Sequence, residues 1–168
     1  MSLNKPLLLA LLFLCTLQGA RTQDKPQILL RPKPQEDIIL AVPDVQPQNP
    51  QRASEVADAL RTFNQVLWDD LRFSGYFTMA GRSYYPPKPI VRQEDLDYEA
   101  WNALPFRVSF LTAGTMDVIG GGLRAELRIF DMKQRTMSFG KLISGDADQV
   151  RSIAHLWADE IVYRLTAG

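Results

Sequence analysis

Two stretches of the chain repeat apolar residues at the spacing of an α-helix. The first follows Asn49, a predicted N-cap, and Pro50, which fits the first turn of a helix. It continues for about six turns and stops before Ser74 and Gly75, where glycine can adopt the left-handed conformation that ends a helix. The second follows Asp146, a predicted N-cap, and Gln149, which occupies the capping-box position. The apolar faces comprise Ala53, Val56, Ala57, Leu60, Phe63, Leu67 and Leu71 in the first helix, and Val150, Ile153, Ala154, Trp157, Ile161, Val162 and Leu165 in the second.

Other parts of the chain alternate apolar and polar residues, as strands do. The alternation is cleanest in residues 123–129, which place four apolar side chains on one face and three charged ones on the other. We predict an α/β fold, a mixed β-sheet with two long helices packed on one face, in a single domain. Further strands are predicted at Asp37–Val42, Phe77–Ala80, Phe106–Gly114, Thr115–Ile119 and Thr136–Ile143. A kink is expected at Gly114 and a hairpin turn at 120–122. A short helical segment at Glu94–Asn102 is expected to turn Trp101 inward.

The first twenty residues have the character of an export signal. Lys5 is positive, Pro6–Leu17 is a nearly unbroken apolar run, and small residues end the segment at Ala20. This order is typical of a secretory signal peptide, and the run is shorter than the ~20 apolar residues of a membrane span. We therefore predict cleavage near Ala20, with Gly19 and Thr22 as alternative positions, and a periplasmic protein that does not span the membrane.

A proline-containing arm is predicted to follow the signal peptide. Residues 21–36 hold three prolines, and their one apolar cluster is Ile28, Leu29 and Leu30. Such a triplet could add to an exposed sheet edge of a partner, although the sequence alone favours a simple tether. The predicted organisation is thus a signal peptide at 1–20, an extended arm at 21–36 and a domain at 37–168.

Composition excludes several classes of function. Nineteen basic residues balance nineteen acidic ones, so no basic footprint for nucleic acid is present and no nucleic-acid partner is expected. One histidine and one cysteine, Cys15 within the signal peptide, offer too few ligands for a zinc site. Gly120–Gly122 has neither the lysine nor the following helix of a phosphate loop. We expect no metal and no cofactor.

The acidic and aromatic clusters also have simple explanations. Asp69 and Asp70 are adjacent on the first helix and therefore point in different directions, and Asp159 and Glu160 do the same on the last. We interpret both pairs as solvated surface charge. Core packing is the interpretation for the tryptophans, which are Trp68, Trp101 and Trp157.

His155 is the one residue that suggests a nucleophilic site. Ser152 precedes it by three residues and Asp159 follows it by four, so all three are close on one helix. No strained turn or oxyanion arrangement accompanies them. We interpret His155 as a structural histidine at the edge of the core, hydrogen-bonded to Asp159, and predict no catalytic residue.

Four segments carry a pattern beyond simple periodicity. They are Asp37–Pro43 (DIILAVP), Asp70–Phe77 (DLRFSGYF), Leu123–Asp131, which ends in RIFD, and Ile153–Thr166 (IAHLWADEIVYRLT). With these segments the chain resembles the TolB amino-terminal domain family of the Tol-Pal envelope system. The last segment is similar to that family's I-A-H, A-D-x-I-Y and L-T-G helix pattern.

The resemblance implies a non-enzymatic scaffold that serves envelope integrity and cell division. In that family the extreme N-terminal segment docks on the carboxy-terminal domain of TolA, and a β-propeller that follows the domain meets the lipoprotein Pal. Arg21–Glu36 corresponds to the docking segment, with Ile28, Leu29 and Leu30 as the expected contact residues. No propeller repeats occur in this sequence, so Pal is expected as a partner only if a propeller follows in the full-length protein. The alternatives are an envelope or appendage-assembly protein of the same fold outside Tol-Pal, and a hydrolase using Asp159 and His155.

Overall fold

A computed structural model describes residues 37–166 and contains one mixed sheet. The strand order is β3-β1-β4-β5-β6, and β2 pairs with β4 farther along that strand. Strand β1 is parallel to β3 and β4, whereas β4, β5 and β6 form an antiparallel meander. The strands are β1 (Ile38–Ala41), β2 (Gln46–Pro47), β3 (Phe77–Met79), β4 (Phe110–Ile119), β5 (Gly122–Asp131) and β6 (Thr136–Asp146), and the α-helices are α2 (Ala53–Phe73), α3 (Tyr98–Asn102) and α4 (Val150–Thr166).

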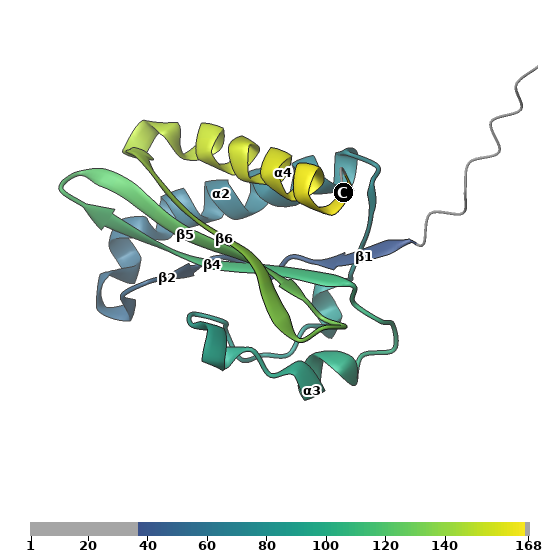
Figure 1. Cartoon of the computed structure of the whole chain (residues 1–168). Helices are drawn as coiled ribbons and strands as arrows, with labels where there is room; N and C mark the ends of the chain where they lie inside the picture. Colours follow the sequence, from purple (N-terminus) through teal and green to yellow (C-terminus); the bar gives the residue numbers. More distant parts are fainter. Residues whose placement is uncertain (1–36, 167–168) are drawn as a thin grey trace, which may run out of the picture. The chain divides into compact units, whose positions relative to one another are not determined.

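The two long helices, α2 and α4, cover the same face of the sheet (Figure 1). Their apolar stripes meet the inward residues of β5 in one cluster that includes Phe63, Leu67, Leu127 and Trp157. All four of these side chains are fully buried, so water is excluded from the space between helices and sheet. The predicted α/β fold class, a mixed sheet with two long helices on one face, is confirmed. No helix within residues 37–166 has the length and apolar character that crossing a membrane requires.

Both long helices begin where the sequence indicates, and α2 also ends there. The Asn49 side chain accepts the Gln51 N–H at 3.0 Å, which caps the 3₁₀ turn Pro50–Arg52 that leads into α2. At the other end of α2, Gly75 has φ +72°, the left-handed conformation predicted for it. The Asp146 N–H donates to Gln149 Oε1 at 3.2 Å before α4, as a capping box requires.

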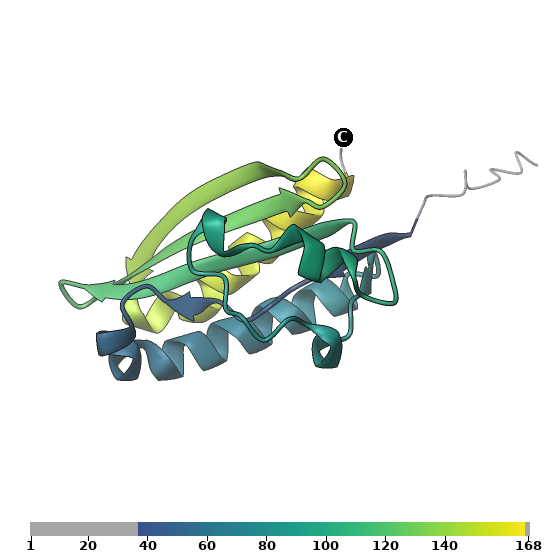
Figure 2. The same cartoon turned by 90° about the horizontal axis from the view of Figure 1, so that it is seen from below.

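The opposite face of the sheet has a cover of its own, built from the segment between β3 and β4 (Figure 2). Buried residues of this segment, Trp101 among them, pack on Leu111 and Ala113 of β4. The predicted single helix over Glu94–Asn102 is wrong, although the inward orientation of Trp101 is confirmed. The chain instead forms a 3₁₀ turn and then α3, because Asp97 adopts an extended conformation and its side chain accepts the Glu99 N–H at 3.0 Å.

Strand β4 is continuous from Phe110 to Ile119, so the predicted start at Phe106 and the predicted kink at Gly114 are both wrong. Gly114 serves a different purpose. A Cβ built on it would lie 2.5 Å from the carbonyl oxygen of Glu126 and 2.7 Å from Leu127 Cδ2, both on β5. Glycine therefore permits the close approach of two central strands. The last strand, β6, ends three residues later than the predicted Ile143, at Asp146.

We expect Gly114→Ala to destabilise the domain by roughly 1–3 kcal/mol, because the added methyl group forces β4 and β5 apart. The matched control is Gly140→Ala on β6, where the nearest atom to an added Cβ is Met137 Sδ at 3.6 Å, an ordinary contact. Urea unfolding followed by tryptophan fluorescence measures both. Equal stability of the two variants would contradict the close-approach explanation.

Candidate functional site

The partner-binding residues predicted from the sequence, Ile28, Leu29 and Leu30, lie outside the described residues 37–166. Their role therefore stays a prediction. Polar and aromatic side chains of the described domain meet at several places, and four of these are central to the fold. These are the start of α2, the contact between α2 and α4, the contact between α4 and β6, and a hollow beside Tyr85.

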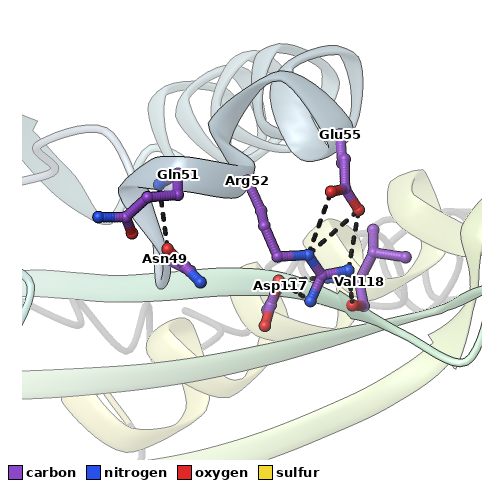
Figure 3. Close-up of polar contacts among 6 residues, drawn as sticks. All are labelled: Asn49, Gln51, Arg52, Glu55, Asp117 and Val118. Carbon is purple, nitrogen blue, oxygen red and sulfur yellow. Dashed lines mark hydrogen bonds and ion pairs between the residues drawn. The ribbon is translucent and has the colours of Figure 1, made fainter.

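At the start of α2, Arg52 connects the helix to the end of β4 (Figure 3). One guanidinium nitrogen donates to the Val118 carbonyl oxygen at 2.8 Å and to Glu55 at 2.8 Å, while the other lies 3.4 Å from Asp117 Oδ1. The hydrogen bond with Glu55 raises the pKa of Arg52, and the same bond lowers the pKa of Glu55. The cluster keeps both groups charged and fixes the helix on the β4–β5 hairpin.

His155 joins α4 to α2 rather than bonding along its own helix. Its Nδ1 lies 2.5 Å from Asp70 Oδ2, and half of the histidine side chain is exposed. The predicted partner Asp159 is therefore wrong, and so is the interpretation of Asp70 as free solvated charge. The reason is tertiary: packing of α2 against α4 brings together two residues that are 85 positions apart in the sequence.

Glu160 anchors α4 to the outer strand. It accepts from Lys141 Nζ on β6 at 2.7 Å and from Arg164 Nε on α4 at 2.8 Å. These two hydrogen bonds lower the pKa of Glu160, with the bond from Lys141 as the larger cause. Its side chain is only 16% exposed, so Glu160 is not the solvated charge that the sequence predicted. The Arg164 guanidinium also lies over the Phe139 ring of β6, 4.0 Å from its centroid.

A hollow of about 420 Å³ lies between the β1–β2 connection and the cover of the second face. Tyr85 and Trp101 line it, with Arg82 and Asp44 forming an ion pair at 3.4 Å among the lining residues. Arg82 is held further by Trp68, because its guanidinium lies 4.1 Å from that ring centroid. The cations and carboxylates here thus neutralise one another and leave a polar but balanced surface.

The Tyr85 hydroxyl has a structural role in the hollow. It donates to the Ala80 carbonyl oxygen at 2.9 Å and accepts the Val42 N–H at 3.0 Å, so it connects β1 to the cover of the second face. Burial raises the pKa of Tyr85 to about 12, because the charged phenolate would lose its hydration.

The groups just described each join one element of the fold to another. Within residues 37–166, no group of three or more His, Cys, Asp or Glu side chains is arranged to hold a metal ion. In the same range every buried side-chain nitrogen or oxygen has a hydrogen-bond partner. Ser152, the nucleophile considered from the sequence, makes no side-chain hydrogen bond with His155, whose Nδ1 is bonded to Asp70.

Residues 27–137 of the chain match the TolB amino-terminal domain family. The chain belongs to this family. The match begins ten residues before the described domain and continues into β6. It confirms the resemblance seen in the sequence.

Curated relatives named Tol-Pal system protein TolB are similar to the chain over most of its length. The protein from Desulfosudis oleivorans is 30% identical over 104 residues, which are 60% of this chain and 23% of the relative. The protein from Pseudomonas fluorescens is 26% identical over 156 residues, 93% of this chain and 34% of the relative. The chain thus spans between a quarter and a third of the curated relatives it matches.

A solved structure supports the fold. The crystal structure of TolB from Acinetobacter baumannii superposes with a TM-score of 0.59 at 16% identity, over 79% of this chain and 29% of that one. At this identity the likeness is one of fold.

Sequence reasoning missed the contacts that join distant elements. The Asp70–His155 and Lys141–Glu160 pairs have no local signature, because each depends on how a helix packs. The sequence gives only a weak indication that Tyr85 is buried. This tyrosine lies among prolines in an irregular segment, where burial is not the usual expectation.

We expect the stability of the domain to fall between pH 10 and 12 in part through Tyr85. The pKa of Tyr85 is about 12 in the fold against about 10 in an unfolded chain, so the fold favours the neutral phenol. That contribution is fully present below pH 10 and is lost as pH rises towards 12. Tyr85→Phe should lose roughly 1–3 kcal/mol at pH 8, because two backbone groups lose their partner, and should show a shallower decline above pH 10.

The control for this prediction is Tyr84→Phe, which changes a neighbouring tyrosine that is 54% exposed. Urea unfolding at pH 8 and at pH 11.5 gives the comparison. If Tyr84→Phe and Tyr85→Phe altered the pH dependence equally, the burial explanation would be wrong.

Proposed function

We propose that the chain is a non-enzymatic protein-binding module of the Tol-Pal envelope system, located in the periplasm. The observation that carries the proposal is membership of the TolB amino-terminal domain family, together with relatives named as Tol-Pal system proteins. The described domain adds support of a different kind. Its ion pairs join one element to another, and its lone histidine is bonded to Asp70.

We further propose that the chain has the three segments that the sequence indicates. Residues 1–20 act as a signal peptide, 21–36 as an arm, and 37–168 as the folded domain. The charge, apolar run and small residues of the first segment support export. Strand β1 (Ile38–Ala41) pairs with β3 and β4 inside the sheet, which supports including it in the folded domain.

The arm is the proposed docking element for a TolA-like partner, specifically the carboxy-terminal domain of TolA. Ile28, Leu29 and Leu30 form the only apolar cluster between Arg21 and Glu36, so they are the residues able to bury apolar surface against a partner. An extended segment can also contribute backbone hydrogen bonds when it lies along an open sheet edge. Pal binding is proposed only for a full-length protein in which a propeller follows.

Calorimetric titration with the carboxy-terminal domain of the same organism's TolA tests the docking proposal. We expect the chain beginning at Arg21 to bind and the chain beginning at Asp37 not to bind. The melting temperature of the domain should be the same in both, because residues 37–166 already contain its core. A variant with Ile28, Leu29 and Leu30 all changed to Asp keeps the length of the arm and should also fail to bind.

The matched control is Gln35→Asp, which adds one negative charge to the arm outside the apolar cluster and should bind like the unaltered chain. Equal binding by the chains beginning at Arg21 and Asp37 would place docking in the domain. Absence of binding by either would favour the alternative, an envelope or appendage-assembly protein of the same fold outside Tol-Pal.

A further inference from the structure

The last strand of the sheet, β6, has an open edge. It pairs with β5 on one side, and no segment within residues 37–166 pairs with its other side. Figure 2 shows it as the outermost strand of the sheet, running the length of the domain. Eleven residues, Thr136–Asp146, make this edge much longer than the opposite one, which is the three-residue β3.

This edge lacks most of the features that keep natural edges from pairing. Short strands, prolines, outward lysines and bulges are the usual protections. β6 contains no proline, and its register shift lies near its beginning, opposite Ile129 and Phe130. Its single lysine, Lys141, is bonded to Glu160 over the helix face and does not guard the edge. The strand is therefore free to pair from about Phe139 onward.

The hydrogen-bond pattern of β4, β5 and β6 indicates which backbone groups of β6 are available for pairing with another strand. Gly120 and Gly121 both have positive φ, 60° and 84°, and form the two-residue turn between β4 and β5. The residues that flank such a turn exchange hydrogen bonds, and the direction of bonding then alternates along each antiparallel strand. By this alternation, β5 bonds to β6 at Lys141, Ile143 and Gly145. The N–H and C=O groups of the residues between and before them, Gly140, Leu142 and Ser144, therefore point away from the sheet.

The sequence of β6 is compatible with pairing to itself. In an antiparallel pair centred on Leu142, the two Leu142 side chains meet on the outer face, where each is 51% exposed in the single chain. Gly140 then faces Ser144 of the second copy, and Lys141 faces Ile143. An apolar pair at the centre with small or apolar neighbours is a favourable cross-strand arrangement.

The charges of β6 do not oppose this register. Its two charged side chains are Lys141 and Asp146. In the pair centred on Leu142, Lys141 faces Ile143 of the second copy, and Asp146 lies beyond the paired stretch Phe139–Gly145. Like charges directly opposite one another would destabilise a strand pair, and none occurs here.

Helix α4 presents exposed apolar residues on the same side of the domain. Leu156 and Tyr163 are 58% and 65% exposed and lie seven residues apart, hence on one helix face. Leu156 precedes Glu160 by four residues and Tyr163 follows it by three, so both are near Glu160 on the helix surface. Glu160 is hydrogen-bonded to Lys141 of β6, the residue next to Leu142. A two-fold axis through Leu142 therefore brings Leu156 of one copy towards Tyr163 of the other.

We propose that β6 and the adjoining face of α4 form the interface through which two copies of this chain associate. The two sheets join into one continuous sheet by antiparallel pairing of β6 with β6, centred on Leu142. The helices lie on the same side of the joined sheet, and Leu156 and Tyr163 cover each other across the axis. This interface is independent of the arm and of any TolA-like partner.

Sedimentation velocity over a concentration series, on the chain as its host processes it, tests the proposal. We expect a dimer that dissociates on dilution. Leu142→Lys and Leu142→Asp each place like charges opposite one another on the axis and should weaken association at least about 100-fold. An equimolar mixture of the two variants should recover the dimer, because Lys and Asp then face each other.

The matched control is Ile119→Lys, which changes a similarly exposed apolar residue at the β4–β5 turn and should dimerise like the unaltered chain. Amide hydrogen exchange gives a second readout: the N–H groups of Gly140, Leu142 and Ser144 should be protected in the dimer and exchange faster on dilution. A chain that stays monomeric at all concentrations would overturn the proposal, as would normal dimerisation of both Leu142 variants. Protection of these amides in a monomer would also overturn it and would assign the edge to a segment of the same chain.

Discussion

Strand β4 must be buried on both of its faces, and the rest of the domain is arranged to meet that constraint. Six consecutive residues, Leu111–Met116, are buried, with Met116 in the cluster under the helices and Leu111 and Ala113 in the cluster on the other face. A strand buried on both sides needs two covers. Helices α2 and α4 provide one, and the segment between β3 and β4 provides the other. Gly114 completes the arrangement by letting β5 approach.

The two covers differ in reach, and that difference leaves one side of the domain open. The helices extend over β5 and β6, where Trp157 stacks near Phe139 at 6.1 Å between ring centroids and Glu160 binds Lys141. The second cover packs on β1 and β4 and contacts the later part of β5, through Phe130 and through Arg128, which donates to the Val91 carbonyl oxygen at 3.2 Å. The outer face of β6 is consequently uncovered, and apolar side chains such as Leu142 stay exposed there. The same topology that buries the middle of β4 on both faces therefore exposes the edge that we propose as an interface.

A feature of this fold can be predicted from the sequence when the residues that cause it lie close together in the chain. Helix ends were predicted correctly because caps are local: Asn49, Gly75 and Gln149 act within a few residues of their own position. The strands were predicted from alternation, yet Gly114 was misread as a kink, since its actual role depends on the β5 backbone that lies opposite. Contacts between elements, such as that of His155 with Asp70, could not be predicted, because the packing of α2 on α4 decides them.

The distribution of charge fits a protein whose contacts with others are apolar or made by backbone groups. Three cations near the contacts between helices and sheet each bind a carboxylate. Arg52 binds Glu55 and Asp117, and Lys141 and Arg164 both bind Glu160. Ion pairs at partly exposed positions contribute little to stability, but they fix orientation and neutralise one another. A chain with equal numbers of acidic and basic residues, arranged in such pairs, has little long-range field to attract a charged partner. The two recognition elements proposed above, the apolar triplet of the arm and the open strand edge of the domain, are both short-range features. Each proposal requires a partner that offers strand backbone and apolar surface together.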